Sequence, residues 1–469
     1  MDHSGAHNRP HVALLPSAGM GHLTPTLRLA ASLANHGLQV TLIVGHPIVS
    51  AAESKLISRF LSAFPADQVR EKQFDIVSVD PATVNSKDPF FIQREATRRS
   101  LQILPSLVSS LSPPISALVS DVFLMSPVLE ATAHLKDLPQ YILFTSSARM
   151  FSLFASYHTF FSETSPDFSK VGDFIETPFP GVVPIPISSL PPPLRDPKTW
   201  FASTFMEDSK KLSSFDGVLI NTFGKLESDS LKGGKLLDGL PPLFTVGLVP
   251  CDFEKGSEEG GSAIIKWLDD KEPGSVVYVS FGSRTTMAKE QIREMGEGLV
   301  RSGCPFLWVV KDKIVDKEDN DSLEDVIGDA ELVEKMKEKG LVVKEWVDQG
   351  EVLGHKSVGG FVSHCGWNSV VEAAWYGVRL LGWPQGGDQR INAEVVERSG
   401  LGVWAKDWGW MGERVIKGED IGGKIGEIMR NDLLKFQAEQ IGEEARKAVG
   451  DGGSCENAMK ELIGKWKNE

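Results

Sequence analysis

Short apolar runs rich in β-branched residues alternate with helical patterns along most of this 469-residue chain. The first run, residues 11–16, precedes a segment with apolar residues at helical spacing, and Gly37 marks the end of that segment. Further runs in the first half of the chain are residues 39–45, 74–79, 115–121, 141–146 and 217–223. Strands that are buried on both faces and alternate with helices are typical of a parallel α/β sheet.

A second series of the same kind begins with residues 275–283. Its later runs are residues 305–311, 340–346, 358–364 and 378–383. Between the two series, residues 250–262 are acidic, rich in Gly and Ser and without periodicity, as expected of a linker. We therefore predict two doubly wound α/β domains facing a cleft: residues 1–249 and 263–445, with residues 446–469 as a C-terminal helix that packs back on the first domain.

The composition is that of an ordinary globular protein, with 41% hydrophobic and 24% charged residues. The net charge of -14 disfavours nucleic acid or an anionic membrane as a partner, because no global positive field attracts phosphate. The four cysteines form no C-x-x-C pair, which disfavours a zinc ribbon or a dithiol redox site. The N-terminal residues of the sequence lead us to expect no secretory signal, and the sequence has no apolar stretch of about 20 residues. We expect a soluble, cytoplasmic monomer without a metal.

Two segments stand apart from the alternating pattern. Residues 185–197 are rich in proline, and residues 311–340 are densely charged. We expect both to be solvated surface, with a lid or a partner surface as the alternative.

The segment FVSHCGWNSVVEAAW, residues 361–375, passes from a predicted strand into a predicted helix. His364, Gly366, Asn368 and Ser369 fall near the start of that helix, where backbone N–H groups and the helix dipole attract anions. A diphosphate cradle is one interpretation, and a purely structural helix cap is another. A zinc site would need further ligands that no nearby His or Cys cluster supplies, and Cys365 has no suitably placed base.

Residues 346–389, which begin WVDQGEVLGH and end PQGGDQ, closely resemble the signature box of plant family-one UDP-dependent glycosyltransferases. The resemblance extends over the whole chain, including PSAGMGHLTP near the N-terminus and SFGS before the box. It implies a GT-B fold of two Rossmann-like domains. It also implies UDP-glucose as the donor substrate, held mainly by the C-terminal domain, with no cofactor and no metal.

The resemblance also implies a role for each matching position in binding the donor. The implied contacts are Trp346 and the Val347 backbone with uracil, Gln349 and Glu372 with ribose, Ser283, His364, Asn368 and Ser369 with the diphosphate, and Trp367, Asp388 and Gln389 with the sugar. These roles make physical sense, because an indole face stacks on a base and a carboxylate accepts two hydroxyls. In the absence of a metal, the helix dipole and His364 are expected to neutralise the diphosphate.

A histidine follows the first predicted strand on the turn SAGMGHL. A dinucleotide fingerprint does not fit this turn, because Thr24 occupies the place of its last glycine and the next strand ends without an acidic residue. His22 alone would also fit a structural role. The resemblance implies that His22 is the catalytic base and that Asp121 orients it. An acceptor hydroxyl would then lose its proton, and the acceptor would attack the anomeric carbon of UDP-glucose with inversion.

Residues 85–100 and 120–128 resemble plant flavonoid C-glucosyltransferases, which join glucose to an aromatic carbon of phloroglucinol-type acceptors such as phloretin, 2-hydroxyflavanones or flavones. The motif Asp88-Pro89-Phe90 is associated with carbon transfer in that subgroup, although alone it would also fit an ordinary turn. The expected acceptor contacts are Asp88, Phe90, Phe91, Phe123, Met125 and Tyr157, with Phe161 as a further candidate; the aromatic ones would equally fit the core.

Two alternatives to carbon transfer stay open. One is an O-glucosyltransferase with the same donor. The other is a catalytically silent UDP-sugar-binding protein, which the intact His22, Asp121, Asp388 and Gln389 disfavour.

The box departs from the common pattern at three positions. Asp348 and Arg379 occupy positions that usually hold proline, and we expect both to be surface or turn changes. Gly386 occupies a position where C-glucosyltransferases often carry histidine. Because Gly386 lies beside Asp388, we expect it to enlarge or loosen the sugar end of the site.

Overall fold

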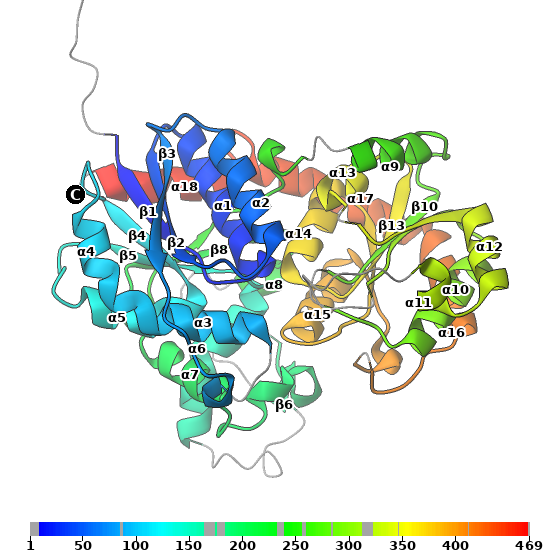
Figure 1. Ribbon diagram of the computed structural model, residues 1–469, viewed down its shortest axis with the longest axis horizontal. Helices are drawn as coiled ribbons and strands as arrows, with labels where there is room; N and C mark the ends of the chain where they lie inside the picture. Colours follow the sequence, from blue (N-terminus) through cyan, green and yellow to red (C-terminus); the bar gives the residue numbers. More distant parts are fainter. Residues whose placement is uncertain are drawn as a thin grey trace, which may run out of the picture. The chain divides into compact units, whose positions relative to one another are not determined.

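The computed structural model describes residues 9–84, 88–163, 174–175, 183–231, 239–255, 259–282, 285–311, 322–345, 347–410 and 412–467. The chain forms two compact units (Figure 1). Unit 1 comprises Met1–Phe253 together with Lys447–Glu469, and unit 2 comprises Glu254–Arg446. Each unit contains a parallel sheet, which confirms the predicted α/β class.

The sheet of unit 1 has the order β3-β2-β1-β4-β5-β8-β9, and all neighbouring pairs are parallel. Its strands are β1 (His11–Leu15), β2 (Gln39–His46), β3 (Val69–Asp75), β4 (Ala117–Asp121), β5 (Gln140–Phe144), β8 (Gly217–Ile220) and β9 (Leu243–Thr245). The strand order reverses between β1 and β4, and Leu15 pairs with Ser120 at their carboxyl ends. Ligands of open α/β sheets bind beyond the carboxyl ends of the strands at such a reversal.

The third strand lies earlier in the chain than its predicted position at residues 74–79. The observed β3 has a largely polar sequence, VREKQFD, and most of its residues are half-exposed or exposed. It lies at the edge of the sheet with β2 as its partner. Apolar runs identify strands that are buried on both faces. The position of this polar edge strand was therefore predicted wrongly, and the short edge strand β9 was not predicted at all.

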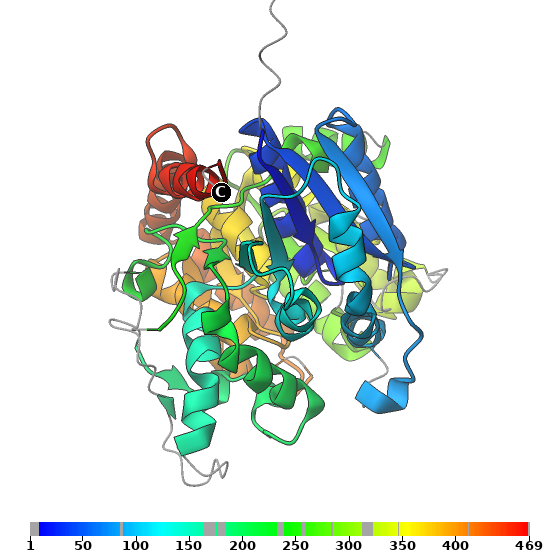
Figure 2. The ribbon, with the colours of Figure 1, turned by 90° about the vertical axis from the view of Figure 1, so that its left-hand side faces the viewer.

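The helices of unit 1 cover both faces of its sheet, whose strands lie side by side in Figure 2. Val12 and Leu14 pack with α1 (Met20–Asn35) and α2 (Ala51–Ser62). Ala13 and Leu15 point to the other face, toward α4 (Leu104–Ser109) and α5 (Met125–Thr132), because successive side chains of a strand alternate. The remaining helices of this unit are α3 (Pro89–Ser100), α6 (Ala148–Glu163), α7 (Trp200–Lys210) and α8 (Ser228–Leu231).

The C-terminal helix α18 (Ser454–Lys467) belongs to the core of unit 1. Met459, Leu462, Ile463 and Trp466 follow the spacing of one helical face and join the cluster that contains α1 and α2. The Trp466 ring meets the Tyr141 ring edge-on, with centroids 5.5 Å apart. This segment therefore completes one face of the first sheet.

The proline-rich segment is less exposed than expected. Ile185–Pro186 forms β7, which pairs with β6 (Phe174–Ile175) in a separate antiparallel sheet. Leu190 and Leu194 are fully buried. The segment is bonded to α6, because Arg149 donates to the carbonyl oxygens of Val183 and Pro184. It is part of the packed structure of unit 1, and the expectation of a solvated loop was wrong.

The sheet of unit 2 repeats the same topology with the order β12-β11-β10-β13-β14-β15. Its strands are β10 (Val276–Ser280), β11 (Phe306–Val309), β12 (Gly340–Val343), β13 (Val358–Ser363), β14 (Arg379–Gly382) and β15 (Gly402–Trp404). The order reverses between β10 and β13, where Ser280 pairs with Ser363. Both units are therefore Rossmann-like, and each has a reversal point of its own.

The helices of unit 2 include an unusually close pair. Its helices are α9 (Glu259–Asp269), α10 (Lys289–Ser302), α11 (Leu323–Ile327), α12 (Ala330–Lys339), α13 (Gln349–Leu353), α14 (Trp367–Tyr376), α15 (Gln389–Ser399) and α16 (Gly418–Met429), and α17 (Asp432–Val449) ends in unit 1. A Cβ at Gly298 on α10 would lie 2.7 Å from Ile421 on α16. Glycine at this position therefore allows the two helices to pack closely against one side of β10.

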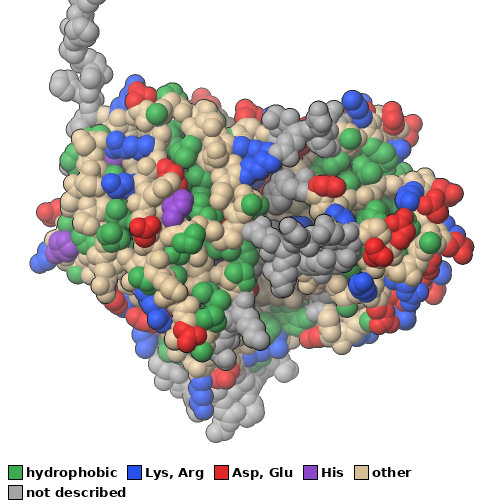
Figure 3. All heavy atoms as spheres, in the orientation of Figure 1, with side chains coloured by type: hydrophobic (Ala, Val, Ile, Leu, Met, Phe, Trp, Pro, Cys, Tyr) green, Lys and Arg blue, Asp and Glu red, His purple; other side chains and the backbone are tan. Residues whose placement is uncertain are grey.

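The described part of the charged segment 311–340 forms α11 and α12, which expose acidic and basic side chains (Figure 3). Lys335 pairs with Glu331 and Lys337 with Glu334 along the helix surface. Exposed pairs of this kind contribute little stability. No helix among the described residues is long and apolar enough to cross a membrane.

Arg379 was expected at the surface, but only 4% of it is exposed at the start of β14. Its Nε donates to the carbonyl oxygen of Gly359 at 2.8 Å. Its Nη1 donates to the carbonyl oxygens of Ile428 and Met429 at 3.2 and 2.9 Å. These are among the last carbonyls of α16, which have no partner within the helix. Arg379 therefore joins the C-terminus of α16 to the sheet, and the expectation of a surface change was wrong.

Candidate active site

His22 lies in the first turn of α1, just beyond the carboxyl end of β1. Gly19 precedes the helix with a φ of 101°, a conformation that favours glycine. Its N–H donates to the Glu53 carboxylate on α2 at 2.5 Å. A Cβ at Gly19 would lie 3.4 Å from the Phe90 ring at the start of α3. The turn that carries His22 is therefore held in place by two neighbouring helices.

The imidazole of His22 is paired with a buried carboxylate. Its Nδ1 lies 2.7 Å from Oδ2 of Asp121, the last residue of β4, whose side chain is fully buried. The other carboxylate oxygen accepts from the N–H of Phe123 at 2.9 Å. Because a carboxylate only accepts, the neutral imidazole carries its proton on Nδ1 and has its lone pair on Nε2. The His22 side chain is 20% exposed, so this arrangement is suited to a general base.

A third residue of this arrangement was missed in the sequence. Thr145 follows β5, and its Oγ1 lies 3.0 Å from Nδ1 of His22. The strand order puts β5 next to β4, so the end of β5 lies on the same edge of the sheet as Asp121. A polar residue directly after a third parallel strand was the signal that could have identified it.

Four half-buried aromatic side chains of unit 1 lie near His22, and we call them the aromatic cluster. They are Phe91, Phe123, Trp200 and Phe201. Phe123 packs directly against the imidazole. The Phe123 and His22 ring centroids are 4.6 Å apart. Phe91 packs edge-on against Trp200 and Phe201, and Phe123 packs edge-on against Phe201. Phe91 and Phe123 were among the acceptor contacts predicted from the sequence. Trp200 and Phe201, at the start of α7, were missed, although two adjacent aromatic residues could have indicated an aromatic site.

The motif Asp88-Pro89-Phe90 begins α3. Oδ1 of Asp88 accepts from the N–H of Phe90 at 2.9 Å, and Pro89 occupies the first turn. Phe90 is 6% exposed and lies beside Gly19. The motif therefore has a clear structural role, which is to place α3 against the turn that carries His22.

Two predicted acceptor contacts require correction. Met125 and Tyr157 are both fully buried, so a ligand cannot reach either side chain without a rearrangement. The Tyr157 hydroxyl donates to the carbonyl oxygen of Leu194 at 2.9 Å, as expected of a core tyrosine. An aromatic or apolar residue in a sequence does not reveal whether it lines a pocket or fills a core. The side chain of Phe161 lies outside the described residues.

In unit 2, the chain turns sharply between β13 and α14. Cys365 has a φ of 64°, and among the described residues other than glycine it alone has a positive φ. Its N–H donates to Oγ of Ser363, and its carbonyl oxygen accepts from Nδ2 of Asn392 at 3.1 Å. Such a conformation costs energy and persists only where its surroundings enforce it. Gly366 then caps the N-terminus of α14. Asn392, buried on α15, was missed in the sequence.

His364 is packed tightly at this turn. A Cβ at Gly366 would collide with its ring, and a Cβ at Gly282 would lie 2.8 Å from Nε2. Its Nδ1 is buried, and no described residue forms a hydrogen bond with it. Burial lowers the pKa of His364 to about 4. The imidazole is therefore uncharged at neutral pH in this structure, where it has the character of a neutral hydrogen-bonding group. Its role in neutralising a diphosphate stays a prediction.

Three predicted ribose and phosphate contacts meet beside this turn. Nε2 of Gln349 donates to Oε2 of Glu372 at 2.7 Å and to Oγ of Ser369 at 3.0 Å. Gln349 lies at the start of α13, where the Asp348 carboxylate caps the helix by accepting from the N–H of Glu351. The substitution of proline by Asp348 is therefore a helix cap. Val347 is 8% exposed, and Asn368 lies in the first turn of α14.

The predicted sugar contacts lie at the start of α15, apart from Trp367. Oε1 of Gln389 accepts from the N–H groups of Gln385 and Gly386 at 2.7 and 2.9 Å. Asp388 accepts from Nδ2 of Asn392 at 2.9 Å. Trp367, the first residue of α14, is only 4% exposed, so its indole offers little surface to a ligand, and its contact with the sugar stays a prediction.

A Cβ at Gly386 would meet no atom within 4 Å. A larger side chain therefore fits at this position without disturbing its neighbours, in keeping with the expectation that glycine leaves the sugar end of the site open.

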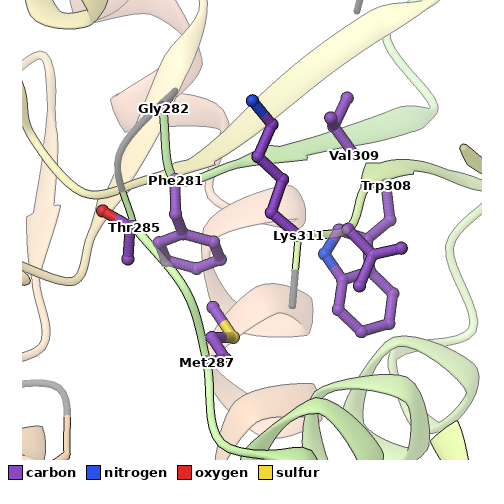
Figure 4. A pocket seen from close by; sticks show the side chains of 8 residues that line it. Phe281, Gly282, Thr285, Met287, Trp308, Val309 and Lys311 are labelled. Carbon is purple, nitrogen blue, oxygen red and sulfur yellow. The ribbon is translucent and has the colours of Figure 1, made fainter. Parts of the chain in front are cut away.

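A pocket opens at the carboxyl ends of β10 and β11 (Figure 4). Its lining residues are Phe281, Gly282, Thr285, Met287, Trp308, Val309, Val310 and Lys311. Ser283 and Trp346, which were predicted to bind the diphosphate and the uracil, lie outside the described residues. Among the residues that the structure describes, no group of three His, Cys, Asp or Glu side chains is placed to hold a metal ion.

Known proteins were compared with this chain in sequence and in structure. Residues 261–435 match the family model described as UDP-glucoronosyl and UDP-glucosyl transferase. UDP-glycosyltransferase 708G2 of Citrus unshiu is 55% identical, over 99% of this chain and 98% of that protein. UDP-glycosyltransferase CGT of Oryza sativa subsp. japonica is 44% identical, over 97% and 96%.

The solved structures include the crystal structure of LpCGTa in complex with UDP, at 43% identity, a TM-score of 0.83 and coverage of 98% of this chain and 99% of that chain. These similarities confirm the GT-B fold and support the binding of a UDP-sugar. The chain belongs to the UDP-glycosyltransferase family.

Proposed function

We propose that this UDP-glycosyltransferase transfers glucose from UDP-glucose, with inversion, to an aromatic carbon of a flavonoid or phloretin-type polyphenol. The observation that carries the proposal is the 2.7 Å contact between Nδ1 of His22 and the buried carboxylate of Asp121. A protein that only bound UDP-sugars would need no oriented base in unit 1, because its donor-binding motif lies in unit 2.

His22 is the general base in this proposal. Asp121 keeps the Nδ1 proton in place, so that Nε2 accepts the proton of an acceptor hydroxyl. The carboxylate also stabilises the imidazolium that forms. A phenol with further hydroxyls on its ring is a suitable acceptor, because its anion delocalises charge onto the ortho carbons.

Carbon transfer then requires no additional catalytic group. The ortho carbon of the phenolate attacks the anomeric carbon as the bond between that carbon and the UDP oxygen breaks. UDP departs with the bonding electron pair, and the anomeric centre inverts. The attacked ring carbon loses its hydrogen as a proton to water, which restores the aromatic ring. Carbon and oxygen attack differ in the orientation of the acceptor, which the protein controls.

The aromatic cluster supports an aromatic acceptor. Its four side chains are half-buried, and Phe123 packs against His22 itself. Aromatic rings prefer edge-on and offset contacts, which this cluster offers to a planar polyphenol. The rice relative named CGT, which abbreviates C-glucosyltransferase, supports carbon as the site of attack.

We assign the donor to the residues that meet around the turn between β13 and α14. Glu372, oriented by Gln349, accepts from the ribose hydroxyls. The neutral imidazole of His364 and the N-terminus of α14 receive the diphosphate. Oε1 of Gln389 is engaged by two backbone N–H groups, so its Nε2 is the atom that donates to a sugar hydroxyl, beside the Asp388 carboxylate.

The product of one incubation with UDP-glucose and phloretin tests the proposal. We expect a glucoside that survives hot acid, because a carbon–carbon glycosidic bond does not hydrolyse. Its fragmentation mass spectrum should show cleavage across the sugar ring instead of loss of the whole hexose. A product that hot acid returns to phloretin would instead show an O-glucosyltransferase. No product with any phenolic acceptor would leave UDP-sugar binding as the function.

A further inference from the structure

Arg94 on α3 is a buried cation with unusual surroundings. It is 3% exposed, and its Nε and Nη1 are buried without a hydrogen-bond partner among the described residues. Its guanidinium carbon lies 4.1 Å from the ring centroid of Phe123, 4.9 Å from that of Trp200 and 5.2 Å from that of Phe201. Burial lowers the pKa of Arg94 to about 10, so it stays charged at neutral pH. The faces of three rings replace the usual hydrogen-bond acceptors.

The carboxylates that attract Arg94 have other partners. They belong to Asp208, Asp121 and Glu95, and Arg98 repels Arg94. Glu95 accepts from Nε of Arg99 at 2.8 Å. Asp208, however, accepts from the N–H and hydroxyl of Ser126 and from Arg98 at 3.3 Å. Asp121 is bonded to His22 and to the N–H of Phe123.

A buried cation without a hydrogen-bonded partner normally destabilises a fold, and an apolar side chain of similar length would often serve stability better. The three ring contacts offset part of this cost. An apolar side chain would avoid the cost altogether, so packing alone does not require an arginine at this position.

Phe123 connects Arg94 to the acid–base pair. Its N–H donates to Asp121, and its carbonyl oxygen accepts from Nη1 of Arg98. Its ring packs against the imidazole of His22, with the two ring centroids 4.6 Å apart. The backbone of Phe123 is thus tied at both sides. The orientation of its ring depends on the groups packed against it, and among these Arg94 has the shortest distance to the ring.

We propose that Arg94 is a positioning residue for the acid–base pair, and that its guanidinium holds the ring of Phe123 in place beside the imidazole of His22. This inference rests on the proposed function of His22 as the base. It gives α3 a second role: its first residues support the turn that carries His22, and its second turn supports the ring beside that histidine.

The variant Arg94→Met tests the inference, because it keeps an unbranched side chain comparable to the aliphatic part of arginine and removes the charge and the planar guanidinium. We expect kcat with UDP-glucose and phloretin to fall by about tenfold or more, whereas the KM for UDP-glucose stays unchanged. We also expect the Tm to stay the same or rise, since an uncompensated buried charge has been removed. A wild-type kcat, or a Tm that falls together with kcat, would contradict a positioning role.

A double-mutant cycle with Phe123→Leu shows whether Arg94 acts through this ring. We expect Arg94→Met to lower kcat much less in the Phe123→Leu background than in the wild type. Equal losses in both backgrounds would overturn the inference. Wild-type enzyme assayed in the same series separates the two proposals: if it forms no glucoside, the proposed function fails, whereas an active wild type and an equally active Arg94→Met variant refute only the role of Arg94.

Discussion

Asn392 donates a hydrogen bond from Nδ2 to the carbonyl oxygen of Cys365, over 3.1 Å, and thereby ties α15 to the turn at which β13 gives way to α14. The same Nδ2 group donates to Asp388 at 2.9 Å. One fully buried amide therefore joins the turn that we assign to the diphosphate and the carboxylate that we assign to the sugar.

The variant Asn392→Asp should weaken donor binding. It places a carboxylate oxygen where the amide donated, facing the carbonyl of Cys365 and the carboxylate of Asp388. An unpaired buried acceptor costs about 1–3 kcal/mol. If this cost falls on the donor-binding conformation, the affinity for UDP drops by about five- to 150-fold. Isothermal titration with UDP measures this loss. The matched control is Asn431→Asp, because Asn431 accepts from the N–H of Leu434 at a helix start, where aspartate serves equally well. Wild-type affinity in Asn392→Asp would contradict this account of the turn.

The variant Arg379→Ala should destabilise the protein without a specific effect on catalysis. It removes the donors that pair with the last carbonyls of α16 and with Gly359. We expect the free energy of unfolding to fall by about 2–4 kcal/mol, because the carbonyl oxygens of Gly359 and Met429 lose this donor and the Ile428 carbonyl keeps only the N–H of Asn431. Urea unfolding followed by tryptophan fluorescence measures it. The exposed Arg398 provides the control, since Arg398→Ala should change stability by less than about 0.5 kcal/mol. An Arg379→Ala variant as stable as the wild type would show that these bonds contribute nothing.

His364 should make the ligand-free protein sensitive to acid. Burial lowers its pKa to about 4, whereas the unfolded chain has the ordinary value of 6.5. Between these values the unfolded chain binds a proton that the folded chain does not bind. The stability associated with this group is therefore complete above pH 6.5 and is lost as the pH falls toward 4.

The measurement is the Tm of wild type and His364→Asn at pH 7 and pH 5. The loss of Tm on acidification should be smaller in the variant, because asparagine does not titrate. The exposed His134 is the control, and His134→Asn should behave as the wild type does. If His364→Asn loses as much Tm as the wild type, the imidazole is not the group that responds to acid.

The pairing of His22 with Asp121 could be predicted from the resemblance and from the strand pattern, because both residues lie at the carboxyl ends of parallel strands, which share one edge of a sheet. Thr145, at the end of the neighbouring strand, was missed. Gln349 and Glu372 lie in a long and specific motif, and the structure brings them together. The resemblance and the strand pattern were each sufficient to predict two Rossmann-like domains.

What could not be predicted depends on tertiary packing. Nothing in the segment REATRRS distinguishes the buried Arg94 from its exposed neighbour Arg99. From its sequence context, Tyr157 would fit a pocket or a core equally well. Its hydroxyl donates to the carbonyl oxygen of Leu194, far away in sequence, which shows that it belongs to the core. Arg379 was expected at the surface or in a turn, but it is buried by partners on α16 that lie far away in sequence.

The most direct test of the central claim is the kcat of His22→Gln with UDP-glucose and phloretin. Glutamine is close in size to histidine and cannot act as a base at neutral pH, so kcat should fall by about 10²–10⁴-fold. The affinity for UDP and the Tm should stay near their wild-type values, since the donor residues lie in unit 2 and the turn at Gly19 is intact. A His22→Gln variant that glucosylates phloretin at the wild-type rate would contradict the assignment of His22 as the base.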